Sequence, residues 1–452
     1  MSLLHDYKQP QNKKQSKFSM RRQRPIAASV LPRLADHGQA TTDICIVGLG
    51  YVGLPLAALL ADKALRIAGC DIRESVVEAV NDGRITIVEP HLDELVEKVA
   101  RSGKLKAFRS PQPANAFIIA VPTPTDEHHN ADLTAVMSAA RSIAPVLKTG
   151  NLVVLESTSP VGTTEAVADL LASLRPDLTF PHQAPGRSDI MLAYCPERVL
   201  PGAAIRELTE NSRTLGGLDR RSGEQARELY AKFVTGKLAV TSARAAELSK
   251  LAENSFRDVN IAFANELSML CDRIGVNVWE VIETANLHPR VNILSPGAGV
   301  GGHCIPVDPW FIHEMAPDIT PLVRTAREVN DSKPHFVVNK IVEAVGENRD
   351  AKIALLGLAY KPNVDDMRES PSIEIVEELM RLGYRNLHAV EPHAESLPDV
   401  LRVDSVTHHR KLDYAIEQAA VVAVLVPHKA FERIKLLPIG DYVLIDPVGY
   451  VR

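Results

Sequence analysis

The stretch DICIVGLGYVGLP, residues 43–55, decides the fold of the first half of this chain. Its first five residues form an apolar run typical of a buried strand, and its last residues open a segment of helical composition. Between them lies a GxGxxG motif made by Gly48, Gly50 and Gly53. A second apolar run ends at Asp71, 18 residues after the last of these glycines. Strand, glycine turn, helix, strand and acidic residue in this order are typical of a dinucleotide-binding βαβ unit.

Each glycine of this motif has its own expected role. Gly48 permits the tight turn, Gly50 lets the backbone approach a pyrophosphate, and Gly53 lets the helix pack on the strand. The start of the helix then supplies an anion site. Asp71 is expected to accept hydrogen bonds from the adenosine ribose, which favours NAD over NADP, although the neighbouring Arg73 weakens that preference. The alternative is a structural βαβ unit with chance glycines.

Length and composition indicate a multidomain globular protein. The chain has 452 residues, of which 45% are hydrophobic and 24% charged, so two or three domains are expected. No apolar run is long enough to span a bilayer, and no signal peptide is recognised. The five cysteines are widely spaced without a CxxC pair, which argues against disulfides and a zinc site, so no metal is expected. We predict a cytoplasmic protein.

The first 41 residues differ from the remainder of the chain in charge. They carry eight Lys and Arg against two Asp, a net charge of +6, so the remainder carries about −11 of the total of −5. The segment is polar and lacks apolar periodicity, which predicts a disordered tail. A basic arm can contact nucleic acid or anionic lipid. The favoured interpretation is a solvated extension with no such partner.

The strand and helix alternation continues to about residue 202. Apolar runs at 116–121 and 152–155 lead into polar turns, where ligands bind in open parallel sheets. Thr123 is therefore a candidate cofactor contact. Thr158 and Thr164 fit a cofactor contact and a helix N-cap equally well.

The middle of the chain is predicted to hold one long helix. From about residue 241 the sequence runs about thirty residues without Gly or Pro until Gly275, with apolar residues three and four apart. Lys250, Asn254 and Arg257 share one face of that helix. The alternative for this face is ordinary solvation, and a helix of this length is also a natural dimer element.

A glycine-rich stretch follows the helix. It reads GAGVGGHCIPVDPW at residues 297–310 and places Cys304 just after four glycines, with Asp308 four residues later. Glycines at that density permit positive φ and a close backbone approach to a ligand, which leaves the thiol accessible. The alternative is a turn that carries an incidental buried thiol.

A second α/β pattern closes the chain. Its expected strands and helix are residues 352–357, 372–382 (the helix), 387–390, 421–426 and 442–445. The first loop of this pattern lacks GxGxxG, which predicts a different phosphate ligand. Lys361 and Arg368 can supply the charge that glycine amides supply in the first half, or they are ordinary surface bases.

Five strings together resemble the UDP-glucose/GDP-mannose dehydrogenase family over residues 42–452. They are GLGYVGLP, ESTSPVG, AELSKLAENSF, PGAGVGGHCIPVDP and LAYKPNVDDMRESPS. The resemblance implies an α/β fold in which two Rossmann-like doubly wound domains are joined by a central helical domain with one long helix. It divides the chain into a disordered tail, an NAD-binding domain, a central dimerisation and catalytic domain and a UDP-sugar-binding domain: residues 1–41, 42–235, 236–335 and 336–452.

The resemblance also implies an activity. A homodimer oxidises the C6 alcohol of a UDP-sugar to a carboxylate with two NAD, and neither nucleic acid nor a membrane span takes part. Finer strings such as TIVEPHLDEL, AYCPERVLPG and HPRVNIL favour UDP-N-acetyl-D-mannosamine as the substrate, for bacterial surface polysaccharide synthesis. UDP-N-acetylglucosamine, UDP-glucose and GDP-mannose stay open as alternatives.

Site residues follow from the resemblance by position. Lys250 or Asp308 takes the hydroxyl proton, Asn254 donates to the developing oxyanion, Cys304 captures the aldehyde and carries the thioester, and Glu197 activates water. Lys250 is expected to lower the pKa of Cys304. The NAD contacts implied are Tyr51, Val52, Asp71, Thr123 and Thr164, with Arg368 near the cofactor and the substrate together. Gly48, Gly50, Gly53 and Thr158 remain cofactor candidates from the sequence pattern above. The substrate contacts implied are Arg198, Val199, Lys250, Asn254, Arg257, His288, Arg290, Gly301, Tyr360 and Lys361, with His288 and Arg290 reaching across a dimer.

One departure and two other readings accompany this hypothesis. The family commonly has a basic residue after Asp-x near its C-terminus, whereas this chain has Asp446-Pro447-Val448. A two-electron dehydrogenase of the 6-phosphogluconate type does not need Cys304. A dinucleotide-sensing protein without catalysis does not need the set of Lys250, Asn254, Cys304 and Asp308.

Overall fold

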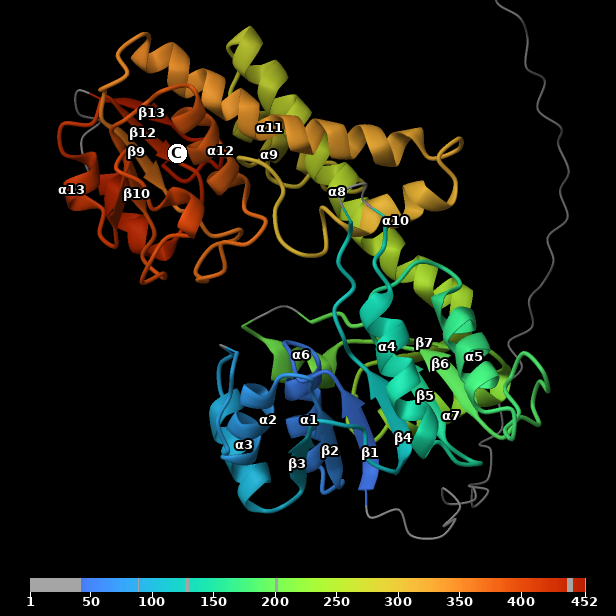
Figure 1. Ribbon diagram of the computed structural model, residues 1–452. Helices are drawn as coiled ribbons and strands as arrows, with labels where there is room; N and C mark the ends of the chain where they lie inside the picture. The colour runs from blue at the N-terminus through green and yellow to red at the C-terminus, as the bar shows by residue number, and fades with distance from the viewer. Residues whose placement is uncertain (1–41, 88, 127–129, 200–201, 437–441, 452) are drawn as a thin grey trace, which may run out of the picture. The chain divides into compact units, whose positions relative to one another are not determined.

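The structure is a computed structural model that describes residues 42–87, 89–126, 130–199, 202–436 and 442–451. The predicted basic tail, residues 1–41, lies outside the described residues. Two sheets and a set of helices between them in sequence make up the described part of the chain (Figure 1). The predicted α/β class is confirmed.

The first sheet has eight strands in the order β3-β2-β1-β4-β5-β6-β7-β8. Its first six strands follow the order of a dinucleotide-binding sheet, and the glycine motif lies directly after β1 at the centre of that order. The strands are β1 (Thr42–Val47), β2 (Ile67–Cys70), β3 (Leu105–Phe108), β4 (Ala114–Ile119), β5 (Leu152–Leu155), β6 (Met191–Tyr194), β7 (Arg213–Gly217) and β8 (Leu238–Ser242). The helices are α1 (Gly53–Asp62), α2 (Glu74–Asn81), α3 (Leu92–Arg101), α4 (Thr134–Ile143), η1 (Ala144–Val146), α5 (Thr163–Leu174), α6 (Ala204–Glu210) and α7 (Arg220–Tyr230).

Helices cover both faces of this sheet because its strands are apolar on both sides. Ile44 and Ile46 of β1 pack in one core cluster with residues of α1, α3 and α7. Cys45 and Val47 point the other way and pack in a second cluster with residues of α4 and α5. The near-continuous apolar strands of the sequence are explained by this double coverage.

One pair of strands breaks the parallel pattern. β7 runs antiparallel to β6, with Tyr194 opposite Gly216, whereas β7 and β8 are parallel to each other. The predicted doubly wound domain therefore ends in a reversed two-strand edge. Strand direction is set by the path of the connection, which apolar periodicity does not encode.

The second sheet has five parallel strands in the order β11-β10-β9-β12-β13. This order matches the first five positions of the first sheet, so the prediction of a second Rossmann-like unit is confirmed. Its elements are β9 (Ile353–Leu356), α12 (Pro371–Arg381), β10 (Leu387–Val390), η2 (Asp399–Leu401), β11 (Val406–His409), α13 (Asp413–Ile416), β12 (Val421–Val424), η3 (Lys429–Leu436) and β13 (Val443–Ile445).

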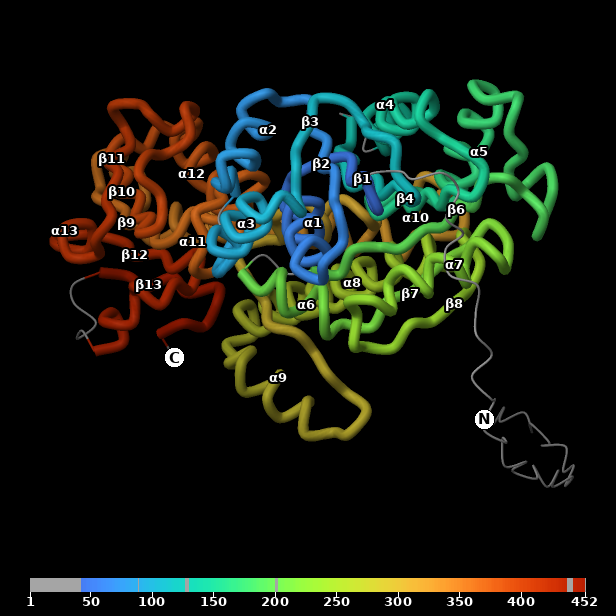
Figure 2. Tube along the Cα trace, turned by 90° about the horizontal axis from the view of Figure 1, so that it is seen from below, coloured from blue at the N-terminus to red at the C-terminus, as the bar shows by residue number. Residues whose placement is uncertain are grey.

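The helix α8 (Ala243–Ile274) spans 32 residues, in agreement with the predicted length of about thirty. Ser242 caps its start by accepting from the backbone of Ala245, and Gly275 ends it in the left-handed conformation at φ 72°. Figure 2 shows α9 (Val278–Asn286) and the segment after it projecting away from α8.

Two further helices complete this part. They are α10 (Asp308–Met315) and α11 (Pro321–Val345), and α11 crosses α8 (Figure 1). α11 is a second long helix of 25 residues that the sequence analysis missed, because Pro334 inside it reads as a break. The expectation of one long helix was therefore incomplete.

A buried polar seam joins α8 to α11. The Arg327 guanidinium is 1% exposed and donates to Asp258 at 2.5 Å. Asn330 donates to the same carboxylate at 2.8 Å and accepts from Asn265 at 2.9 Å. Asn265 in turn accepts from the backbone of Gly297 at 2.9 Å, so this seam anchors the start of the glycine-rich stretch. Buried charges need such partners, which makes the crossing of the two helices specific.

Two glycines of the first loop provide a matched test of this packing. Gly48 has φ 99°, and a Cβ there lies 2.3 Å from the carbonyl oxygen of Ala120, whereas a Cβ on Gly50 meets no atom within 4 Å. Gly48→Ala is expected to lower the free energy of unfolding by about 3 kcal/mol, because backbone strain and a backbone clash combine. Gly50→Ala should leave it within about 1 kcal/mol. Urea unfolding followed by circular dichroism measures both, and equal losses contradict the loop geometry described.

Candidate functional site

Three predicted catalytic side chains form a buried cluster between α8 and α10. Lys250 and Asn254 lie one turn apart on α8 and are 5% and 0% exposed, and Asp308, 2% exposed, is the first residue of α10. Asn254 donates to the Asp308 carboxylate at 2.5 Å and accepts from Arg257. Burial raises the pKa of Asp308 to about 6, and both Lys250 and the hydrogen bond from Asn254 oppose that rise. The face that carries Lys250 and Asn254 is therefore buried, and the solvated alternative is wrong for those two residues.

Cys304 lies at the edge of this cluster. Its backbone carbonyl accepts from the amide of Asp308 at 2.9 Å, which places Cys304 directly before the first turn of α10. The side chain is exposed, whereas the other four cysteines are buried. The prediction of an accessible thiol is thus confirmed for the structure, and the incidental buried thiol is excluded.

Lys250 lowers the pKa of the Cys304 thiol, as expected, but other groups outweigh it. Although the side chain is exposed at the surface, the atoms around the sulfur desolvate it, and this desolvation and the charge of Asp308 raise the pKa of the thiol to about 11. Glu197 adds to the rise and Arg257 opposes it. The two carboxylates and desolvation outweigh the single lysine, so the thiol of the ligand-free chain is protonated at neutral pH.

Glu197 lies in the loop after β6, and hydrogen bonds and an ion pair hold this loop in place. Its charge affects the pKa of both Cys304 and Asp308, so it faces the cluster. Its carboxylate accepts from the backbone of Val199. Arg198, a predicted substrate contact, forms an ion pair with Glu253 of α8 and donates to Thr214 at 3.0 Å. Arg198 thus ties the loop to α8 in this state.

The glycines before Cys304 pack on protein rather than leave space for a ligand. A Cβ on Gly301 lies 2.4 Å from the Glu369 carbonyl, and one on Gly302 lies 2.8 Å from the Tyr360 ring. The Gly302 amide donates to the Glu369 carbonyl at 3.1 Å. Close contact with this loop after β9 is the physical reason for glycine here. Tyr360, a predicted substrate contact, therefore lies against the stretch that carries Cys304.

The first glycine loop and the end of β2 fit a dinucleotide. The open space beside Gly50 leaves its backbone accessible, and the Cβ positions of Gly48 and Gly53 are filled by protein. Asp71 accepts from the Leu49 amide at 3.1 Å, which links the acidic residue to the loop. Its second carboxylate oxygen accepts from the amide and side chain of Arg73.

Thr123 and Thr158 lie in the polar turns that the sequence predicts, whereas Thr164 is the second residue of α5. Thr123 donates to the carbonyl of Thr158 at 2.6 Å, which joins the turns after β4 and β5. The N-cap of α5 is Gly162, so the N-cap alternative is wrong for both Thr158 and Thr164. Thr164 is 1% exposed, and its hydroxyl and amide donate to Glu247 of α8.

Glu247 was missed by the sequence analysis. It is fully buried and also accepts from the Gly162 amide at 2.7 Å, so it supplies a negative charge at the start of α5. Glu247, Lys250 and Asn254 recur every three to four residues on α8. This spacing indicates that the three side chains share one face of the helix. It identifies Glu247 as part of the site only when that face is known to be buried.

Arg368 is held by a residue that the sequence analysis also left without a role. It pairs with Asp366 at 2.7 Å, and His303 contacts the same carboxylate at 3.3 Å. Burial opposes ionisation, but the hydrogen bonds from Arg368 and His303 lower the pKa of Asp366 to about 2. Asp366 also raises the pKa of Tyr51 from the first glycine loop. Tyr51 and Arg368, two predicted NAD contacts, therefore both interact with the charge of Asp366.

Other predicted residues are not brought to the cluster. His288 and Arg290 are exposed after α9, where the Arg290 amide donates to the His288 ring. Lys361 lies 5.4 Å from the centre of the Tyr360 ring. Val52 precedes α1, at its N-cap position.

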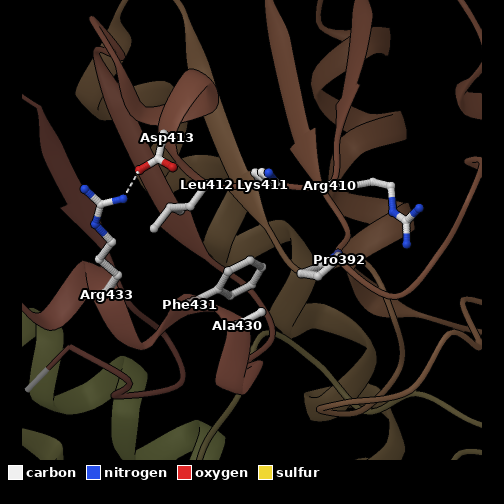
Figure 3. A pocket seen from close by; sticks show the side chains of 8 residues that line it. All are labelled: Pro392, Arg410, Lys411, Leu412, Asp413, Ala430, Phe431 and Arg433. Atoms are coloured by element: carbon white, nitrogen blue, oxygen red, sulfur yellow. Dashed lines mark hydrogen bonds and ion pairs between the residues drawn. The ribbon is translucent and has the colours of Figure 1, made fainter.

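Two pockets lie on the second sheet. Figure 3 shows a pocket of about 200 Å³ past the ends of β10 and β11, where Arg433 pairs with Asp413 at 2.8 Å. None of the predicted site residues lines it. A second pocket, of about 410 Å³, is lined in part by Asp366 and Arg368.

Three family models match successive parts of the chain. They describe the NAD-binding, central and UDP-binding domains of the UDP-glucose/GDP-mannose dehydrogenase family and match residues 42–234, 244–332 and 354–448. The chain belongs to this family. It is thus an NAD-dependent nucleotide-sugar dehydrogenase with the NAD-binding domain of that family, and the resemblance in the sequence is confirmed.

Known relatives agree on the family and differ in their substrates. A UDP-N-acetyl-D-mannosamine dehydrogenase of Campylobacter jejuni is 54% identical over 389 residues, 86% of this chain and 96% of that one. An NDP-N-acetyl-D-galactosaminuronic acid dehydrogenase of Ralstonia nicotianae is 52% identical over 406 residues, 90% and 95% of the two chains. The solved structure of a UDP-D-ManNAc dehydrogenase from Pyrococcus horikoshii has a TM-score of 0.81 at 36% identity, covering 91% of this chain and 100% of that one.

Among the described residues, no helix combines the length and apolarity needed to cross a bilayer.

The charges around Cys304 predict how its reactivity depends on pH. With a pKa of about 11, alkylation of the free enzyme by iodoacetamide should be slow at pH 7 and rise about tenfold per pH unit up to pH 10. Asp308→Asn removes a charge that raises the pKa, so it should speed alkylation at pH 8 by about 3- to 10-fold. Lys250→Met should slow it. Peptide mass spectrometry reads out Cys304, and the same direction of change in both variants contradicts the arrangement.

Proposed function

We propose that this dehydrogenase oxidises UDP-N-acetyl-D-mannosamine at C6 to UDP-N-acetyl-D-mannosaminuronate through a covalent intermediate on Cys304. The observation that carries the proposal is an exposed thiol beside a buried Lys250–Asn254–Asp308 cluster, in a chain with an NAD-binding domain. A simple two-electron dehydrogenase needs no such thiol. A sensor without catalysis needs neither the thiol nor the cluster.

The first oxidation converts the C6 alcohol to an aldehyde. NAD, when bound, is the hydride acceptor for both oxidations. Lys250 or Asp308 takes the hydroxyl proton; Asp308, with a pKa of about 6, is mostly ionised at neutral pH and can accept it. Asn254 donates a hydrogen bond to the oxygen as negative charge develops there.

The second oxidation requires Cys304. The thiol adds to the aldehyde carbon, and its proton is transferred through the Lys250–Asp308 pair to the former aldehyde oxygen, which gives a thiohemiacetal. Loss of a second hydride and a proton leaves a thioester. Glu197 takes a proton from water, the hydroxyl adds to the thioester carbon, and the C–S bond breaks to release the carboxylate and the free thiol. Because the thiol is protonated in the ligand-free chain, its activation belongs to the substrate complex.

The choice of sugar rests on the family strings and on the relatives, which are named for two different sugars. Homologues from Campylobacter jejuni and Pyrococcus horikoshii are named for N-acetylmannosamine, whereas the Ralstonia relative is named for N-acetylgalactosaminuronic acid. The substrate contacts proposed are the residues implied by the family, with Arg257, Tyr360 and Gly301 beside the cluster. UDP-N-acetylglucosamine, UDP-glucose and GDP-mannose are the alternatives with the same chemistry. A role of the product in a surface polysaccharide belongs to the same proposal.

The working unit that we propose is a homodimer built on α8. Large apolar side chains on this helix are exposed at a seven-residue spacing: Phe256, Phe263 and Leu270 are 68%, 51% and 51% exposed. Residues seven apart share one side of a helix, and an exposed apolar stripe marks an interface. The proposed division at residues 235 and 335 assigns this helix to a central dimerisation domain. His288 and Arg290, exposed and away from the cluster, fit a site on the partner subunit.

NADH formed per nucleotide sugar consumed tests the chemistry. Two NADH per sugar are expected, with UDP-N-acetyl-D-mannosamine turned over fastest against the three alternatives and UDP-N-acetylgalactosamine. Cys304→Ser should give limited NADH and then stall, because only the second oxidation needs the thiol. Turnover of Cys304→Ser with two NADH per sugar sinks the covalent mechanism. If two NADH form per molecule of another sugar, the covalent mechanism is supported and UDP-N-acetyl-D-mannosamine is rejected as the substrate.

Light scattering tests the dimer. Phe263→Glu places a charge in the middle of the proposed interface and is expected to give a monomer at concentrations where the unchanged chain is dimeric. Tyr414→Glu is the matched control, since Tyr414 is 71% exposed on α13 of the second sheet. If Phe263→Glu stays dimeric, the stripe on α8 is not the interface.

A further inference from the structure

The reversed edge of the first sheet supports the loop that carries Glu197. β6 and β7 pair antiparallel with Tyr194 opposite Gly216, so the chain that leaves β6 runs toward the start of β7, where Arg213 lies. The loop is hydrogen-bonded along this edge: the Asn211 side chain donates to the Arg198 carbonyl at 2.9 Å. Arg198 in turn donates to the Ser212 carbonyl at 2.9 Å. In a parallel arrangement the start of β7 would lie beside the start of β6, away from the loop that carries Glu197.

Arg213 is the buried member of that edge. It is 1% exposed and donates to the carbonyl of Pro196, directly before Glu197, at 3.4 Å. Its Nε and Nη2 atoms have no hydrogen-bond partner within the described residues. Burial disfavours the guanidinium charge, but the acidic groups Cys195, Glu156, Tyr230 and Glu197 raise the pKa of Arg213 above its ordinary value.

A buried carboxylate stands behind Arg213. Glu156 directly follows β5, is 1% exposed and accepts a hydrogen bond from the Tyr230 hydroxyl at 2.5 Å. Its second oxygen has no partner among the described residues, and no ion pair within 4 Å joins it to Arg213. Each of the two buried groups nevertheless affects the pKa of the other, and charges act more strongly on each other in a buried environment.

We propose that Arg213 is a positioning residue for Glu197, with Glu156 and Tyr230 as the buried support of its charge. The proposal rests on the role of Glu197 proposed above. Arg213 donates to the Pro196 carbonyl directly before Glu197, so it sets where the carboxylate meets the thioester. Its two unpaired N–H groups leave it able to follow the charge of Glu197 as that residue gains and loses a proton.

Glu156 gives this network a pH dependence. Burial raises the pKa of Glu156 to about 7, while Arg213 and the Tyr230 hydrogen bond oppose the rise and Glu197 adds to it. Cys195, Tyr230, Arg213 and Glu197 are the titratable or charged groups that act on this carboxyl or are acted on by it. Below pH 7 Glu197 is the main carboxylate partner of Arg213, and above pH 7 Glu156 competes for the same charge.

Rapid-mixing kinetics with intact-protein mass spectrometry tests the proposal. With UDP-N-acetyl-D-mannosamine and NAD, Arg213→Met should keep the NADH burst within about twofold and slow steady turnover by about 100-fold, because only hydrolysis needs the placed carboxylate. A covalent adduct of the sugar acid on Cys304 should accumulate. Arg213→Lys should turn over at least about tenfold faster than Arg213→Met, because lysine keeps the positive charge. Arg221→Met is the control, because Arg221 donates to the Ser188 carbonyl at 2.9 Å, away from the Glu197 loop.

Glu156→Gln is the second variant, and it keeps the proposal testable if Arg213→Met does not fold. It should remove an inflection near pH 7 from the hydrolysis rate while leaving the burst unchanged. Equal slowing of burst and turnover in Arg213→Met, or no slowing in either, overturns the positioning role, as does an unchanged pH profile in Glu156→Gln. Glu197→Gln separates the two hypotheses: if it accumulates no adduct, the proposed role of Glu197 itself fails.

Discussion

The buried polar face of α8 is the constraint on which the rest of the structure depends. Glu247, Asn254, Asp258 and Asn265 lie on one helix, and each is fully buried. A buried polar group without a partner is costly, so each fixes a different neighbour: the start of α5, the first residue of α10, an arginine of α11 and the glycine-rich stretch. Rotation or sliding of α8 breaks all four contacts at once. One helix thereby holds in register the first sheet, the thiol loop and the second long helix.

This arrangement leaves Cys304 accessible while the groups around it raise the pKa of its thiol. The glycines ahead of it pack on Tyr360 and Glu369, which places the thiol beside the α8 cluster without covering it. Desolvation and Asp308 then keep it protonated against the influence of Lys250. A thiol that stays protonated reacts slowly with oxidants and alkylating agents.

The reversed edge of the first sheet holds the loop after β6 in place through hydrogen bonds. The charge of Glu197 affects the pKa values of Cys304 and Asp308 in the cluster at α8 and α10. It also affects the pKa values of Glu156 and Arg213 at the edge of the sheet. Such coupling is expected where one residue changes its charge during turnover. The departure from a fully parallel sheet therefore lies next to the proposed chemistry.

The sequence by itself determined the two α/β units, the long helix and the accessible thiol, because periodicity, glycine spacing and helix caps act over a few residues. It also identified the family through five ordered strings. Only the tertiary structure decided which polar side chains are buried and what they meet: Thr164 bonds to Glu247 rather than capping α5, and Gly301 packs on the loop after β9. It also decided the direction of β7 and the high pKa of Cys304. These features depend on groups far apart in the chain, whose distances are set by packing and which no local pattern encodes.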